Sequence, residues 1–227
     1  MSGWFAILTL QSDVSVPDVE PHGRALGIDL GLLSFLATSE GETVQRPKFF
    51  VDLQRKLKLL QRRVSSKKLG SANWKKAQAK VARLHQEIAD TRKDFHFKTV
   101  HHLCNGAGML FTEDLNFKAM SKGMLCKHTL DAGFGQFLNI LNWVSFKRGV
   151  FFAKVDANYT SQLCPECGVN TGKKELSERI HHCPECGYTA DRDVAAAQVI
   201  KMRGLIAAGG HSVKKSAEGT PCEAETL

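Results

Sequence analysis

The chain has 227 residues, of which 43% are hydrophobic, and its 31 Lys and Arg against 23 Asp and Glu give a formal net charge of +8. This balance is typical of a globular protein long enough to bury a substantial core. The longest apolar runs, at residues 4–10 and 149–155, are far shorter than the roughly 18 residues that cross a bilayer, so no membrane-spanning segment is expected. Residues 1–10 lack the basic start of a secretory signal, which predicts a cytoplasmic protein with reduced cysteines.

The first predicted elements are strands. Residues 4–10 are an apolar run typical of a strand, and residues 12–21 form a polar linker that contains proline. Short apolar segments at 25–30 and 34–38, and a third through Val44, are separated by turns that contain glycine. We therefore predict that a three-stranded antiparallel unit opens the folded domain.

A basic helical hairpin is predicted at residues 52–104. Two apolar stripes have helical spacing, and they consist of Leu53, Leu57, Leu60 and Val64 in one helix and of Ala77, Val81, Leu84 and Ile88 in the other. Residues 54–98 contain 14 basic and three acidic side chains, a balance of +11 that leaves the rest of the chain at −3. Such a segment attracts the phosphates of nucleic acids, although a solvated helix face is the simpler alternative. The side chains predicted to bind nucleic acid are Arg55, Lys56, Lys58, Arg62, Arg63, Lys67, Lys68, Lys75, Lys76 and Lys80.

The second half of the chain alternates between strands and helices. Apolar strands at residues 109–114 and 150–156 flank an amphipathic helix at 135–148. A helix rich in Ala, Val and Ile at 194–205 precedes a polar tail at 207–227, which is predicted to be disordered. Together these elements predict an α/β fold in which a mixed sheet with helices is interrupted by the basic hairpin and by a cysteine-rich segment.

The cysteine-rich segment contains the pentapeptide CPECG twice, with 15 residues between the two pairs of cysteines. The four cysteines of these motifs are Cys164, Cys167, Cys183 and Cys186. Their spacing is typical of structural zinc, and four thiolates complete a tetrahedral shell that leaves no position for a substrate water. We predict Zn²⁺ here, with iron held by the same sulfurs and two disulfides as alternatives. The neighbouring His181 and His182 are expected to be exposed rather than to bind the metal.

Three carboxylates occupy unusual positions in this pattern. Asp29 interrupts the apolar strand ALGIDL, Glu113 follows the apolar residues MLFT, and Asp193 opens the Ala-rich helix. A carboxylate on an apolar strand is costly unless a cation or a proton neutralises it. If the three acids converge, they could hold Mg²⁺, and two such ions about 4 Å apart can activate water for attack at phosphorus. Each acid taken singly is more readily explained as a strand-end cap or a solvent-facing residue than as a metal ligand.

Five motifs in order resemble a known family. They are GIDLG at 27–31, EDLNFKAM at 113–120, TSQLCPECG at 160–168, CPECGY at 183–188 and DRDVAAAQVI at 191–200. In this respect the chain resembles the nuclease half of the transposon-encoded TnpB (OrfB-like) proteins, which are relatives of the small type V CRISPR effectors. The resemblance extends over residues 20–206.

The resemblance implies a RuvC-like domain of the RNase H fold, interrupted by a zinc ribbon, that cuts DNA selected by pairing with a guide RNA. The family's catalytic positions fall on Asp29, Glu113 and Asp193 as ligands of two Mg²⁺ ions, with Asp191 as the alternative third acid. The family's zinc ligands fall on the four cysteines of the CPECG motifs. The chain departs from the family at Ala195, where relatives usually have Asn.

The resemblance also implies a division of the chain. Residues 1–24 are expected to be the last strand and linker of an amino-terminal barrel, which in the family binds guide RNA and reads the DNA motif beside the target. The further divisions are the RuvC-like nuclease domain at 25–156, the zinc ribbon at 157–188, the final acid and helix at 189–206 and the tail at 207–227. Because most of that barrel is not in the chain, two alternatives are open. A second chain could supply it, or the protein could be a non-catalytic nucleic-acid-binding module.

Overall fold

The computed structural model describes residues 6, 8–9, 18–120, 122–123, 125–175 and 177–209. Most of the strand predicted at residues 4–10 and most of the tail predicted at 207–227 lie outside the described residues. No helix in the described part is both long enough and apolar enough to cross a membrane.

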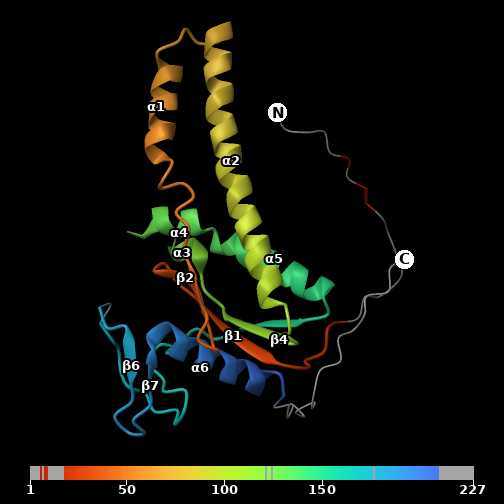
Figure 1. The fold of residues 1–227 in the computed structure, drawn as a ribbon, viewed down its shortest axis with the longest axis vertical. Helices are drawn as coiled ribbons and strands as arrows, with labels where there is room; N and C mark the ends of the chain where they lie inside the picture. The colour runs from red at the N-terminus through yellow and green to blue at the C-terminus, as the bar shows by residue number, and fades with distance from the viewer. Residues whose placement is uncertain are drawn as a thin grey trace.

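A five-stranded mixed sheet forms the centre of the fold, with the strand order β3-β2-β1-β4-β5 (Figure 1). The strands are β1 (Ala25–Leu30), β2 (Ser34–Thr38), β3 (Thr43–Gln45), β4 (Met109–Glu113) and β5 (Phe151–Val155). The first three strands are antiparallel, as predicted, whereas β1, β4 and β5 run parallel to one another. The carboxyl ends of three adjacent strands therefore meet at one edge of the sheet.

Helices cover both faces of the parallel part, and all five residues of β4 are consequently buried. On one face lies α6 (Arg192–Ala207), in contact with β1, β2, β4 and β5 (Figure 1). Two glycines permit this close packing. A Cβ on Gly27 would lie 2.0 Å from the carbonyl oxygen of Ala197, and one on Gly204 would lie 2.1 Å from the ring of Phe111.

The main hydrophobic core lies on the other face of the sheet, beneath α5 (Phe134–Lys147) and the carboxyl-terminal part of α2 (Ala72–Leu103). Phe35 of β2 is fully buried there, and its ring makes an edge-on contact with Phe137 at 5.0 Å between centroids. It also stacks on Phe134 at 5.5 Å. Each aromatic side chain buried in this way contributes about 1.5–3 kcal/mol to the free energy of unfolding.

The basic hairpin extends away from the sheet as two helices, α1 (Gln54–Ser65) and α2 (Figure 1). Leu57 of α1 packs with Leu84 and Ile88 of α2, which confirms the predicted apolar stripes. Ser71 begins α2 because its hydroxyl oxygen accepts a hydrogen bond from the backbone N–H of Trp74 at 3.2 Å. The hairpin is therefore anchored by a small core of its own.

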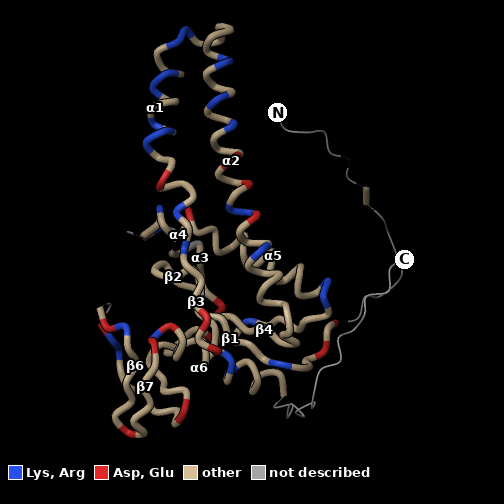
Figure 2. Tube along the Cα trace, in the orientation of Figure 1, with Lys and Arg blue, Asp and Glu red and all other residues tan. Residues whose placement is uncertain are grey.

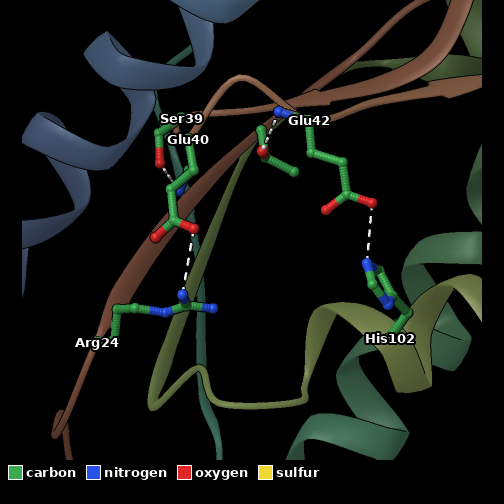
Figure 3. Close-up of polar contacts among 7 residues, drawn as sticks. Arg24, Ser39, Glu40, Glu42 and His102 are labelled. Atoms are coloured by element: carbon green, nitrogen blue, oxygen red, sulfur yellow. Dashed lines mark hydrogen bonds and ion pairs between the residues drawn. The ribbon is translucent and has the colours of Figure 1, made fainter.

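Polar contacts hold the first strands against each other and against α2 (Figure 3). The backbone N–H of Gly27 donates to the hydroxyl of Ser39 at 3.1 Å, and Arg24 pairs with Glu40 at 3.2 Å. His102, near the end of α2, lies 2.9 Å from a carboxylate oxygen of Glu42. These contacts fix the register of β1 and β2, on which the position of the acid in β1 depends.

The fold prediction is confirmed, since the chain forms a mixed sheet with helices that is interrupted by a helical hairpin and by a small cysteine-rich ribbon. The ribbon contains β6 (Ile180–His182) and β7 (Thr189–Asp191). The structure adds two short helices that periodicity did not reveal, α3 (Phe117–Met120) and α4 (Cys126–Ala132). Elements of one or two turns are too short to show a hydrophobic period.

Candidate functional site

Asp29 and Glu113 lie side by side at the carboxyl edge of the sheet. The strands β1 and β4 pair in parallel, with Ile28 opposite Thr112, and each acid is the next residue along its strand. Glu113 is in turn paired with Val155 of β5. Two acids that are 84 positions apart in the chain are thus placed together by the sheet register.

Asp193 reaches the same edge from α6. This helix begins at Arg192, and its residue Ala197 packs against Gly27 of β1. This contact directs the amino-terminal turn of α6 towards the end of β1. A helix amino terminus favours negative charge, which reduces the cost of placing an acid there. Together with Asp29 and Glu113, it forms what we call the acidic edge.

The pKa values of all three acids show how crowded the acidic edge is. Burial raises the pKa of Asp29 well above its usual value, and the carboxylates of Glu113 and Asp193 raise it further. Burial also raises the pKa of Glu113. The pKa of Asp193 is raised by burial and, in addition, by the neighbouring carboxylate of Asp191. Because each acid is disfavoured as an anion, a bound cation would stabilise the site.

The spacing of the three carboxylates bears on the number of ions. Within the described residues, the oxygens of these three carboxylates do not all lie within 4.8 Å of one another. The sulfurs of the four cysteines do meet this distance. As placed here, the three carboxylates are therefore too widely spaced for all of them to bind one shared ion.

The structure also separates the roles of Asp191 and Asp193. A carboxylate oxygen of Asp191 accepts hydrogen bonds from the backbone N–H groups of Asp193 at 2.9 Å and Val194 at 3.4 Å. Asp191 is exposed and acts as the N-cap of α6. The side chain of Asp191 thus caps the helix, whereas the side chain of Asp193 does not take part in the cap.

Residues that sequence reasoning missed surround Glu113. The hydroxyl of Thr160, a buried residue, donates a hydrogen bond to the Glu113 carboxylate and partly offsets the rise in its pKa. Arg203 lowers this pKa as well, and Asp156 raises it. Arg203 also donates to the backbone carbonyl of Asp156 at 2.6 Å. Thr160 opens the motif TSQLCPECG, but nothing in the sequence shows that its partner is a carboxylate on another strand.

The four cysteines predicted to bind zinc converge. Their sulfurs all lie within 4.8 Å of one another, with Cys164 and Cys183 buried and Cys167 and Cys186 exposed. The glycines that follow the second cysteine of each pair both have a φ near +73°, as the tight turns require. Four sulfurs at this separation match the donor set of a structural zinc site.

The ribbon that holds these cysteines is attached to α6. The Tyr188 hydroxyl donates to the Gln198 side chain at 2.5 Å, and β7 leads directly into the helix that carries Asp193. His181 is buried, so the prediction that it is exposed is wrong; its ring lies 2.5 Å from the amino group of Lys174. His182 is exposed, as predicted.

The ten basic side chains predicted to bind nucleic acid are all exposed, and they line the outer part of the hairpin (Figure 2). Between α1 and α2 there is a groove of about 490 Å³. Its basic lining residues are Arg63, Lys67, Lys76 and Lys80. Within the described residues, no ion pair joins these four cations to an acid, so they are free to bind an external anion.

The chain thus combines a mixed sheet that has acids at the ends of its parallel strands with a four-cysteine ribbon. A family model named OrfB_IS605, described as "Probable transposase", matches residues 8–124, and a second one, "Cas12f1-like, TNB domain", matches residues 134–200. The chain belongs to the OrfB_IS605 family, and the predicted resemblance to TnpB is confirmed.

Curated relatives agree with this assignment. One from Escherichia coli (strain K12), named "Putative RNA-guided DNA endonuclease InsQ", is 32% identical over 92% of this chain and 54% of its own. Another, from Streptomyces pristinaespiralis and named "Putative RNA-guided DNA endonuclease", is 34% identical over 96% of this chain and 54% of its own. The chain therefore spans about half the length of these relatives.

A solved structure confirms the fold. The chain is similar to a protein chain in "Cryo-EM structure of the Cas12f1-sgRNA-target DNA complex", with a TM-score of 0.57 and 19% identity. The match covers 83% of this chain and 51% of that chain. At this identity the likeness concerns the arrangement of the backbone, and the chemistry must be argued from the residues of the present chain.

Proposed function

We propose that the protein is the nuclease part of an RNA-guided DNA endonuclease and hydrolyses phosphodiester bonds at the acidic edge. The observation that supports this most directly is the convergence of Asp29, Glu113 and Asp193 from β1, β4 and α6. Nuclease names among the relatives and the RuvC-like fold agree with it.

The acidic edge would hold two Mg²⁺ ions, because the donors are carboxylate oxygens, the ligand type that Mg²⁺ prefers. When bound, these ions would supply the Lewis acidity that phosphodiester hydrolysis needs. The protein's own contribution is to fix the ligands: the sheet register aligns Asp29 with Glu113, and the Thr160 hydroxyl orients the Glu113 carboxylate. Asp191 caps α6 and so positions Asp193 as the third ligand.

The basic hairpin would bind the phosphates of the guide RNA or the DNA. Its ten exposed cations are placed along two helices and around a groove, which suits recognition of backbone charge rather than of bases. DNA and RNA are therefore the partners that we propose. The comparisons do not support the additional protein chain expected from the sequence.

The four cysteines would bind one structural Zn²⁺ ion. Since the ribbon contacts α6 through Tyr188 and Gln198, this metal would stabilise the helix that carries Asp193. The zinc site has no open position and takes no part in hydrolysis.

The decisive experiment is Mg²⁺-dependent cleavage of single-stranded DNA by the purified chain. Asp29→Asn is expected to lose more than about 100-fold in rate, because changes outside the ligand shell of metal sites already cost about 10–100-fold. Asp90→Asn, which alters an exposed acid on α2, is the matched control and should cleave like the unaltered protein. Equal cleavage by both variants would refute the assignment of the acidic edge.

A second candidate function is that of a nucleic-acid-binding module without catalysis, and the basic groove of the hairpin favours it because binding there needs no chemistry. DNA binding that is retained in the complete absence of Mg²⁺-dependent turnover would support this second function over the first.

A further inference from the structure

A cavity adjoins the acidic edge and shares one residue, Asp193, with the proposed metal site. Its volume is about 390 Å³, and we call it the Arg46 cavity. Asp193 contributes to one wall, which places the cavity directly beside the acids. The other lining residues used here are Arg46, His128, Arg179, Leu33 and Leu125.

The polar side of the Arg46 cavity has unused hydrogen-bonding capacity. The Nε of Arg46 donates to the backbone carbonyl of Leu32 at 2.6 Å, which fixes the guanidinium at the turn between β1 and β2. Its Nη1 is buried and, among the described residues, has no hydrogen-bond partner; the same is true of Nδ1 of His128. A buried polar atom without a partner is unfavourable. The guanidinium Nη1 can only donate, and the imidazole Nδ1 donates when it carries the ring proton, so a ligand that supplies oxygen would satisfy both atoms.

The charge of the cavity selects the class of ligand. Arg46 and Arg179 place two permanent cations around a single acid, Asp193, so an anion is favoured. A guanidinium matches a phosphate particularly well because its N–H groups form a planar fork. The polar side of the cavity is therefore suited to a phosphate group.

The apolar side of the cavity indicates what accompanies that phosphate. Leu33 and Leu125 line the cavity, yet their side chains are 62% and 57% exposed. Exposed apolar side chains beside cations form a surface on which the flat face of a base or a sugar can pack. Phosphate on one side and an apolar surface on the other fit one nucleotide.

We propose that the Arg46 cavity binds one nucleotide of the single DNA strand that enters the acidic edge, with its phosphate on Arg46 and His128 and its base or sugar on Leu33 and Leu125. This assignment rests on the proposed function, because it needs a DNA strand at the acidic edge. It makes Arg46 and His128 positioning residues, which hold the strand without contacting the reacting atoms.

Binding tests the proposal independently of cleavage. A short single-stranded deoxyoligonucleotide is titrated, without Mg²⁺, into Asp29→Asn protein labelled with ¹⁵N on its arginine and histidine side chains. The Nε–H signal of Arg46 and the ring signals of His128 are expected to shift in a saturable manner. Signals that stay unchanged while the oligonucleotide saturates the protein would overturn the proposal. Tighter binding of an RNA oligonucleotide of the same sequence at these signals would overturn the assignment to DNA.

Affinity measured by fluorescence anisotropy provides the second test. Arg46→Gln is expected to weaken binding by about tenfold, the effect of losing one hydrogen bond to a charged group. Lys48 lies two positions from Arg46, is exposed and does not line the cavity. Lys48→Gln removes the same charge as Arg46→Gln and should change affinity less than twofold. Equal losses in the two variants would overturn the proposal, provided that circular dichroism shows both to be folded.

Cleavage assays then separate this inference from the proposed function. If the unaltered protein cleaves DNA, Arg46→Gln is expected to raise KM by about tenfold with a smaller change in kcat, because it acts on strand binding. Cleavage that survives in Asp29→Asn would refute the catalytic assignment, whereas the signals of Arg46 would still report on the cavity. An Arg46→Gln variant with unchanged KM would refute the cavity assignment alone.

Discussion

The carboxylate of Glu113 on β4 raises the pKa of Asp29 on the neighbouring strand β1. The parallel pairing of these two strands places both acids at the same edge of the sheet. The structure thus holds like charges together at the edge where α6 begins. This arrangement is unfavourable in the absence of a cation, and a cation that binds it is stabilised for the same reason. The stability of the protein should therefore report on the occupancy of the site.

The first prediction concerns Asp29→Asn in metal-free protein. Since the folded state raises the pKa of Asp29, it holds the proton more tightly than the unfolded chain does. The free energy of unfolding should then fall as the pH rises above the unfolded-state pKa of about 3.9. Asn removes this effect, so the variant should be more stable at pH 7 by about 0.5–2 kcal/mol and less dependent on pH. Thermal unfolding in EDTA between pH 4 and pH 8 measures both quantities.

Addition of Mg²⁺ should reverse the order of stability. A ligand that binds only the folded state stabilises it by about 2.7 kcal/mol at 100 times its Kd. The melting temperature of the unaltered protein should rise with Mg²⁺, while that of Asp29→Asn should stay nearly constant. The same rise in both proteins would show that Mg²⁺ binds elsewhere.

A second prediction concerns the hydrogen bond from Thr160 to Glu113. Thr160→Val keeps the shape of the side chain but removes the hydroxyl, so the pKa of Glu113 should rise and Mg²⁺ should bind about 10–100-fold more weakly. Thr160→Ser keeps the hydroxyl and should retain most of the affinity. Isothermal titration with Mg²⁺, together with the pH dependence of cleavage, tests this. A Thr160→Val protein with unaltered affinity would contradict the positioning role.

A third prediction concerns zinc. The purified protein should contain one Zn²⁺ per chain by elemental analysis, and Cys183→Ser should lose it. Because metal binding and folding are coupled in such small ribbons, hydrogen exchange in residues 160–191 should accelerate in the variant while the sheet strands stay protected. Cys126→Ser, which changes a half-buried cysteine outside the cluster, should retain the metal. If elemental analysis finds iron instead of zinc, the alternative of an iron site on these four sulfurs is correct.

A fourth prediction concerns the groove of the hairpin. Lys76→Gln combined with Lys80→Gln removes two of its cations, and the salt dependence of DNA binding should become shallower by about 1.4–1.8 in log–log slope. Lys98→Gln combined with Lys147→Gln removes equal charge from exposed positions away from the groove. Anisotropy measured from 50 to 300 mM NaCl should show a smaller change in slope for this control pair. Identical slopes in the two double variants would show that the groove does not contact phosphates.

Periodicity and spacing were sufficient to predict the long helices and the strands of the main sheet, but not the short helices α3 and α4. The stripe that contains Leu57 predicted the packing of the hairpin, and the CPECG motifs predicted a cluster that the structure assembles. In both cases the signal lies in residues near one another in the sequence, where local geometry determines which side chains meet. The three acids stood out by their positions in apolar strands and at the start of the Ala-rich helix, and the family motifs gave them their catalytic role. Periodicity cannot place Asp29 next to Glu113.

Long-range relationships escaped prediction for a physical reason. The Arg46 cavity joins the turn between β1 and β2, the segment after β3, the helix α4, the ribbon and the start of α6, and no local pattern connects these five segments. The burial of His181 likewise depends on how the ribbon packs around Lys174. Polar side chains whose partners are distant in the sequence have no periodic signature, so only the assembled structure reveals their contacts.

Asp131 is a further example, and it leads to the last prediction. This residue at the end of α4 is only 2% exposed, and its carboxylate accepts a hydrogen bond from the backbone N–H of Phe50 at 2.7 Å and a longer one from that of Val51 at 3.5 Å. The bonds join α4 to the segment that enters the basic hairpin, across about 80 positions of sequence. Asp131 therefore holds the base of the hairpin against α4.

Asp131→Ala should lower the free energy of unfolding by about 1–3 kcal/mol, because it leaves the backbone N–H of Phe50 buried without an acceptor. Asp52→Ala, which changes an exposed acid in the same segment, should stay within about 0.5 kcal/mol of the unaltered protein. Urea unfolding followed by circular dichroism measures both. Hydrogen exchange should also accelerate at Phe50 and Val51 before it does so in β1 and β4. Equal stabilities for the two variants would mean that other contacts, such as the packing of Phe49 on Phe95, suffice to fix the hairpin.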